Sequence, residues 1–160
     1  MKLDKKRRQE NKTNYRKRLV LLKGNSPRLV VRKSNKYLTI QIIESKDAQD
    51  SVTYSVNTKD LLEHGWPEAK AGSLKSLGAG YLGGYLIGHR AKDIKTRLVL
   101  DTGLIPSTKG SRIYAVVKGV ADSGIKINFD KEIAPTKEMI EGENGKLIND
   151  VLAKIKGGKK

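Results

Sequence analysis

The chain has 160 residues, a length typical of one domain, and carries 33 Lys and Arg residues against 17 Asp and Glu. It has no Cys, which excludes disulfides and thiolate metal sites. No apolar run approaches the roughly 18 residues of a membrane span, and the first apolar cluster is shorter than the core of a secretory signal, which needs about 7 to 15. We therefore expect a cytoplasmic protein.

Most of the positive charge lies at the start of the chain. Fourteen Lys and Arg fall within the first 36 residues, where only Asp4 and Glu10 oppose them, so this segment holds 12 of the 16 net charges. Such a distribution indicates a polyanionic partner. A membrane-binding basic helix needs an apolar face with Trp or Phe, and Trp66 and Phe129 lie far from this segment. Nucleic acid is the preferred partner, and no membrane partner is expected.

The first elements form a basic arm. Residues 1–13 are mostly charged or amide, so we expect them to be disordered alone and to order on a partner. Asn14 is a suitable N-cap for a helix that carries basic side chains on most of its faces. Gly24 is expected to end this helix as its C′ residue.

A hairpin follows the arm. Residues 28–33 predict one strand and residues 37–43 the returning strand, with a turn at 34–36 in which Asn35 can adopt a positive φ. After a polar loop at 45–50, the alternation over 51–56 predicts a third, antiparallel strand.

The rest of the chain alternates helices and strands. Thr58 is expected to cap a helix over 59–63, Ser73 a longer helix, and Ser111 a helix to about Ser123 that ends at Gly124. The core face of that last helix is predicted to consist of Ile113, Val116, Val117 and Val120. Short strands are predicted at 97–101 and 125–127, and a helix-prone polar segment begins at Pro135.

This order predicts an α/β fold: a mixed sheet with an antiparallel hairpin unit, parallel strands added by crossovers, and helices on its faces. We divide the chain into a basic RNA-binding arm and helix (1–24), an α/β globular domain (25–142) and a C-terminal helical tail (143–160). An extended basic arm therefore precedes the globular part.

Three segments carry the predicted contacts with nucleic acid, RNA or DNA. In the arm, Arg can bind phosphate with two parallel hydrogen bonds and Tyr can stack on a base. The hairpin tip projects cations and amides, and the loop at 106–112 ends at a helix N-terminus, which favours anions. The predicted contact residues are Lys5, Lys6, Arg7, Arg8, Lys12, Tyr15, Arg16, Arg18, Arg28, Arg32, Lys33, Ser34, Asn35, Lys36, Lys109 and Arg112.

Other patterns give no catalytic, metal or cofactor site. Residues 78–83 match G-x-G-x-x-G, but no strand precedes them and they lie within a helical apolar period, so we expect close packing of a helix against the sheet or RNA. His64 and His89 lack a ligand-spaced partner. Asp101 ends a strand and could serve a metal-dependent nuclease, which is the alternative function, but the carboxylates that would join it are absent from the first strand.

Several motifs in order resemble one family. Residues 5–19, the hairpin segment 27–36, Gly65-Trp66 with residues 81–86, and the segments 100–104 and 106–115 are similar to archaeal-type 5S-rRNA-binding proteins of the large ribosomal subunit, number eighteen in the universal naming and number five in older eukaryotic naming. The resemblance covers roughly residues 5–142.

The resemblance implies an α/β/α sandwich with ribonuclease H-like topology but without nuclease acids. It also implies a structural, non-enzymatic protein that binds 5S rRNA in the central protuberance and contacts large-subunit rRNA and neighbouring ribosomal proteins. A cofactor, a metal and a small-molecule substrate are not expected, and the protein is expected to be ribosome-bound.

Overall fold

The computed structural model describes residues 4–46 and 49–157. Its elements, in which η marks a 3-10 helix, are α1 Lys6–Gln9, α2 Tyr15–Lys23, β1 Arg28–Lys33, β2 Leu38–Lys46, β3 Gln49–Asn57, η1 Thr58–Leu62, η2 Glu68–Ser73, α3 Leu77–Arg90, β4 Val99–Asp101, α4 Arg112–Asp122, α5 Lys137–Glu141, η3 Gly142–Asn144 and α6 Gly145–Gly157. No helix within these ranges is long and apolar enough to cross a membrane.

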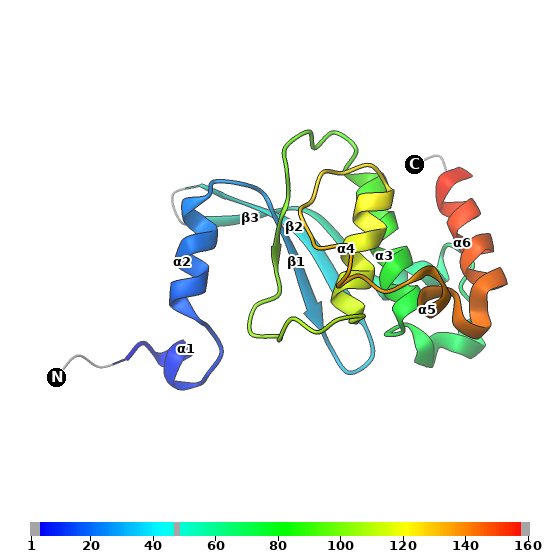
Figure 1. Ribbon diagram of the computed structural model, residues 1–160, viewed down its shortest axis with the longest axis horizontal. Coiled ribbons are helices and arrows are strands. Elements are labelled where there is room, and N and C mark those ends of the chain that lie inside the picture. Colours follow the sequence, from blue (N-terminus) through cyan, green and yellow to red (C-terminus); the bar gives the residue numbers. More distant parts are fainter. Residues whose placement is uncertain (1–3, 47–48, 158–160) are drawn as a thin grey trace.

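The strands form one mixed sheet in the order β3-β2-β1-β4. β1 pairs with β2 and β2 with β3 in antiparallel fashion, whereas β4 is parallel to β1. Helices α3 and α4 lie on one side of the sheet and α2 on the other (Figure 1). The predicted α/β class and mixed sheet are confirmed. The strand expected at 125–127 is wrong, because this segment makes only an isolated parallel bridge between Ile127 and Leu98.

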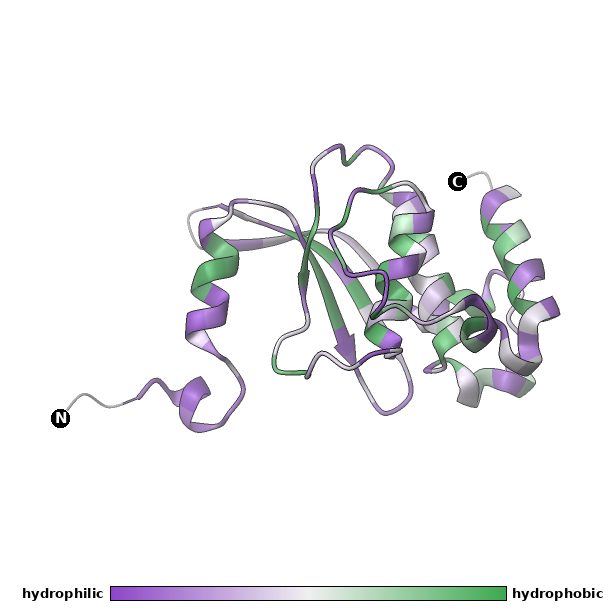
Figure 2. Cartoon of the chain, in the orientation of Figure 1, coloured by the Kyte–Doolittle hydropathy of each residue, from purple (hydrophilic) through white to green (hydrophobic). Residues whose placement is uncertain are grey.

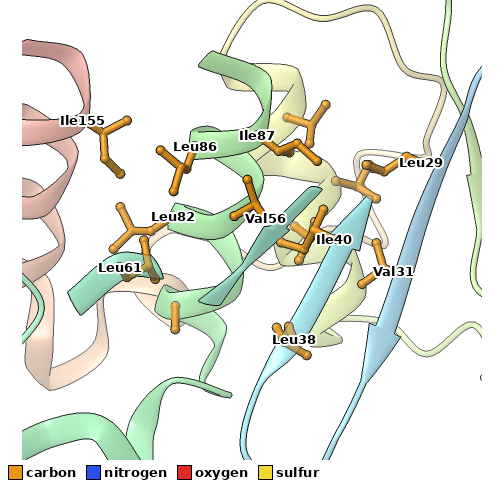
Figure 3. Close-up of a cluster of buried hydrophobic side chains, with 14 of the residues drawn as sticks. Leu29, Val31, Leu38, Ile40, Val56, Leu61, Leu82, Leu86, Ile87 and Ile155 are labelled. Atoms are coloured by element: carbon orange, nitrogen blue, oxygen red, sulfur yellow. The ribbon is translucent and has the colours of Figure 1, made fainter. Parts of the chain in front are cut away.

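The alternation of β1 separates the two faces of the sheet. Leu29 and Val31 are fully buried and belong to the hydrophobic core on the side of α3 and α4. Their neighbours Arg28 and Arg32 point to the opposite face, because successive strand residues alternate. Figure 3 shows Leu29, Val31 and Ile40 of the sheet beside side chains of α3. Aliphatic burial thus stabilises one face, while charged residues occupy the face nearer the arm.

Glycines bring α3 and α4 into backbone contact. A Cβ at Gly84 would overlap the Val116 carbonyl, and one at Gly119 would overlap the Tyr81 carbonyl. Each glycine costs about 1 kcal/mol of helix propensity, so close packing is the compensating gain. The match to G-x-G-x-x-G lies inside α3, as expected for a packing role. Gly83 does face the sheet, at Ile40, but the main partner of the helix is α4.

The last helix packs on the globular part. In α6, Ile148, Val151 and Ile155 are buried and join the core cluster. Figure 3 shows Ile155 beside Leu86 of α3. The predicted helix-prone end of the chain is confirmed over α5 and α6, while the division at residue 143 stays a prediction. The sequence Gly-Gly-Lys-Lys at 157–160 predicts a loose end, which is wrong at Gly157, the last residue of α6. Residues 158–160 lie outside the described residues.

Local predictions near the N-terminus hold with two corrections. β1 has the predicted bounds, and the Lys17 backbone N–H donates to Asn14 Oδ1 at 3.1 Å, so Asn14 caps α2. Gly24 does not adopt the left-handed conformation, which falls instead on Asn25, with φ of 46°. The Asn25 side chain is polar and short, which makes this region accessible to it. Asn35 in the hairpin turn does not have a positive φ.

Two helix starts differ from prediction, and a tertiary contact explains the first of them. Asn57, not Thr58, caps η1 and forms a reciprocal capping box with Asp60. Thr58 is buried, and its Oγ1 accepts a hydrogen bond from the Leu38 N–H at 3.0 Å. Ser76, not Ser73, caps α3, while Ser73 is the last residue of η2 and its Oγ donates to the Lys70 carbonyl at 2.6 Å.

The remaining differences concern strand length and one cap. β2 ends at Lys46 and β3 begins at Gln49, so the two strands occupy most of the loop predicted at 45–50. Residues 47–48 lie outside the described residues. In α4 the four predicted core residues are buried, and Gly124 has φ of 103°, which confirms its place after the helix. Ser111 occupies the N-cap position but makes no side-chain cap bond, and its Oγ is buried without a partner.

Candidate nucleic-acid interface

The arm is an exposed, mostly hydrophilic segment (Figure 2). Its described part is not wholly irregular, because α1 forms one helical turn with no buried residue. Local bonds support this turn: Arg8 pairs with Asp4 at 3.5 Å, and Arg7 Nε donates to Thr13 Oγ1 at 2.9 Å. Residues 4–13 thus contain one local helical turn, and their ordering on a partner stays a prediction. The exposed contacts are individually weak, about 0 to 1 kcal/mol each.

Three further predicted arm residues have partners within the arm. Lys12 Nζ lies 2.8 Å from Glu10, so its charge is partly matched. Lys5 Nζ lies 4.7 Å from the centre of the Tyr15 ring. This cation–π contact occupies one face of the ring, so the predicted stacking of Tyr15 on a base would use its other face or displace Lys5. Lys6 and Arg16 are exposed.

Helix α2 contacts the globular part through two adjacent basic residues. Lys17 Nζ donates to Thr102 Oγ1 at 3.3 Å and to the Gly103 carbonyl at 3.4 Å. Arg18 Nη2 lies 2.9 Å from Asp50 Oδ2 at the start of β3. Lys17 is a residue that the sequence reasoning left out of the contact set, although its position between two predicted residues could have indicated it.

Arg28 lies inside the protein rather than on an RNA-facing surface. Its side chain is only 2% exposed, and its guanidinium pairs with Asp50 at 2.7 Å and Asp101 at 3.2 Å. It also donates to Ser45 Oγ at 2.9 Å. We therefore remove Arg28 from the predicted contact residues: a buried cation must be paired, and these partners from three strands satisfy it.

Asp50 is ionised readily in this network. Burial alone would raise the pKa of its carboxyl, but hydrogen bonds from Ser45, Arg18 and Arg28 and the charge of Arg28 outweigh it and lower the pKa below the ordinary value. Asp50 thus links Arg18 of α2 to Arg28 of β1, and so connects the arm to the sheet through one carboxylate.

The carboxylate of Asp101, which could have suggested a nuclease, stabilises the fold by binding two arginines and a backbone N–H. Asp101 accepts from Arg28, from Arg32 Nη2 at 3.2 Å and from the Gly103 N–H at 2.8 Å. Arg32 also donates to the Asp101 carbonyl at 2.8 Å, so its guanidinium is held against the end of β4. Within residues 4–46 and 49–157, His, Asp and Glu form no group of three or more that could hold a metal ion.

The hairpin tip presents its cations to solvent. Lys33, Asn35 and Lys36 are exposed, and no ion pair involves them within the described chain. Ser34 is used by the turn itself, since its Oγ donates to the Tyr37 carbonyl and accepts from the Tyr37 N–H, both at 2.9 Å. The tip can therefore offer two lysines and one amide to a ligand, while Ser34 shapes the turn.

The hairpin end and the loop at 106–112 meet, although about 75 residues separate them. Lys33 lines one groove together with Gly110, Ser111 and Arg112 at the start of α4, and Figure 1 shows the β1–β2 turn at the same end of the molecule as this helix start. Lys109 and Arg112 are exposed. Ile105 lines this groove and also the groove beside the arm. The predicted contact segments thus lie around two grooves that share Ile105, and we call these segments together the basic side.

Comparison with known proteins identifies the family. Residues 1–96 match the family described as ribosomal large-subunit proteins 60S L5 and 50S L18. The chain is 47% identical over 139 residues to the large ribosomal subunit protein uL18 of Korarchaeum cryptofilum, which covers 86% of this chain and 69% of that protein. It is 41% identical over 141 residues to uL18 of Caldivirga maquilingensis, with 86% and 66% covered. The chain belongs to this family.

Membership confirms the resemblance predicted from the motifs. It indicates a structural, non-enzymatic protein of the large ribosomal subunit, in association with rRNA and other ribosomal proteins. The chain spans about two thirds of the length of these two relatives. In this family context, the exposed cations of the arm, the hairpin tip and the α4 start are the candidate rRNA contacts.

Proposed function

We propose that this protein binds 5S rRNA and helps to anchor it in the central protuberance of the ribosome, in the cytoplasm. The observation that carries the proposal is the placement of exposed cations along the arm, at the hairpin tip and at the start of α4 in a family member. The proposed contact residues are Lys5, Lys6, Arg7, Arg8, Lys12, Tyr15, Arg16, Lys17, Arg18, Arg32, Lys33, Asn35, Lys36, Lys109 and Arg112, with Ser34 shaping the tip and Arg28 supporting the sheet.

Electrostatics supports phosphate binding by this surface. Each Lys or Arg that engages a phosphate releases condensed counterions, so affinity depends on salt. In the arm the charges sit on helical turns, and at the tip they project beyond the sheet. We infer that the arm follows the RNA backbone while the hairpin sets the register of the protein on the RNA.

We further infer that the sheet has the ribonuclease H-like topology implied by the family resemblance. Three antiparallel strands followed by a crossover to β4, parallel to β1, support this inference. The surface of the globular part that faces away from the arm would then be free for neighbouring ribosomal proteins and large-subunit rRNA.

A salt titration of binding to a 5S rRNA transcript tests the proposal. We expect the logarithm of the association constant to fall linearly with the logarithm of salt concentration, by about 0.7 to 0.9 for each phosphate engaged. The double variant K33A/K36A should bind more weakly and reduce the slope by about 1.4 to 1.8. K92A/K95A removes two exposed lysines from the loop after α3 and should bind like the parent. A nearly flat salt dependence of the parent protein would refute RNA binding by this surface.

A further inference from the structure

A groove lies between the arm and the segment that follows β4. Its cationic side chains are Arg7, Lys12, Lys17, Arg18 and Arg32, against the single acid Asp101. The hydrogen bonds of Lys17 to Thr102 and Gly103 connect its two walls. The groove is therefore formed jointly by the arm and the sheet, and it exists because α2 is docked.

Two of these cations keep their charge available for an anionic ligand. Arg18 and Arg32 are paired with carboxylates, and Lys12 with Glu10. Arg7 and Lys17 instead donate to neutral oxygens, and within the described chain neither forms an ion pair. A neutral acceptor leaves the formal charge unmatched, so these two side chains favour an anion between the groove walls.

The groove also has an apolar wall, which a phosphate would not need. Leu21, Leu104 and Ile105 line it beside the cations. Leu104 is 51% exposed, one of the few large aliphatic side chains so open in the described chain. A flat apolar group and an anion carried by the same ligand would satisfy both kinds of wall. A nucleotide is such a ligand, since its base has two apolar faces and its phosphate is charged.

We propose that this groove takes one unpaired nucleotide of RNA, with its phosphate at Arg7 and Lys17 and its base against Leu104. The inference rests on the RNA-binding function proposed above and specifies the ligand of one groove. Double-helical RNA presents mainly phosphates and 2′-hydroxyls to proteins, whereas unpaired bases can be splayed out onto side chains. A helical segment would engage the cations and leave Leu104 in water, so the apolar wall favours the unpaired form.

Two substitutions in the full chain separate the base from the phosphate. L104A removes an apolar contact but no charge, so it should weaken binding of a 5S rRNA transcript at every salt concentration with the salt slope unchanged. We expect at most about fivefold, the lower end of the range for aromatic side chains that stack on bases, because Leu is aliphatic. R7A should weaken binding and reduce the slope by about 0.7 to 0.9. M139A is the matched control, because Met139 is 50% exposed and does not line the groove, and it should bind like the parent protein.

Cross-linking identifies the nucleotide. With thiouridine-substituted transcript, we expect the peptide that contains Leu104 to attach to a nucleotide that chemical probing shows to be unpaired. Attachment to helical nucleotides alone, or parental affinity of L104A while the parent keeps its steep salt dependence, would overturn the inference and leave the proposed function standing. Loss of salt-dependent binding in the parent itself would instead refute the proposed function.

Discussion

Replacing Arg28 by Met should destabilise the fold far more than the same change at Arg32. Both arginines lie on β1 and both bind Asp101, but Arg28 is 2% exposed and Arg32 46% exposed at the side chain. Met keeps much of the side-chain volume, so the comparison isolates the charge. The two variants therefore test whether burial decides how much an ion pair contributes to the free energy of unfolding.

The expected magnitudes follow from these environments. Removing one partner of a buried ion pair costs about 3 to 5 kcal/mol, because a charge remains uncompensated. After R28M, Asp101 keeps Arg32 and the Gly103 N–H, and Asp50 keeps Arg18, so we expect the lower end, about 3 kcal/mol. R32M breaks an exposed pair and should cost at most about 1 kcal/mol.

Urea unfolding followed by circular dichroism at neutral pH measures both free energies of unfolding. If the cost of R28M comes from the uncompensated Asp101, the double variant R28M/D101N should recover at least about 1 kcal/mol of it, because contacting residues are not additive. Equal losses for R28M and R32M, or a loss below about 1 kcal/mol for R28M, would refute the reasoning.

Two further predictions concern other parts of the fold. The pKa of Asp50 is lower in the folded protein than its ordinary value of 3.8, so its ionised form stabilises the fold above that pH, and this contribution is lost as the pH falls through the folded pKa. The difference in unfolding free energy between the parent and D50N should therefore be full at neutral pH and shrink below about pH 4. A difference that does not change with pH would contradict this. G84A should lower the unfolding free energy by about 1 to 3 kcal/mol, because the added methyl meets the Val116 carbonyl. G72A, where a Cβ meets nothing, is the control, and equal effects of the two would contradict the packing of α3 on α4.

Local patterns were sufficient for elements whose own residues define them. The strand 28–33 has the predicted bounds because its apolar run is followed by turn residues, and Asn14 caps α2 through a bond to its own first turn. The helical period over Ile113 to Val120 identified a core face correctly. Such features depend on neighbours within a few residues, so a single sequence contains the information.

Features decided by distant partners were not predictable in this way. Thr58 and Asn57 are both acceptable caps, and the hydrogen bond from Leu38, 20 residues away, decides between them. Arg28 looked like the other cations of the hairpin because its acids lie 22 and 73 residues further along the chain. The other predicted contact residues rest on charge and family resemblance and stay predictions, and the groove beside the arm appears only when β4 and α2 are placed together.

The central claim is that this basic side binds 5S rRNA specifically. Parallel footprinting and affinity measurements with a 5S rRNA transcript and an unrelated structured RNA of equal length test it most directly. The account predicts a defined footprint on 5S rRNA, lost or shortened with K33A/K36A, and binding to the unrelated RNA that is weaker and without a footprint. Equal affinity for both RNAs with no discrete protection would contradict the claim and reduce the surface to a non-specific polyanion binder.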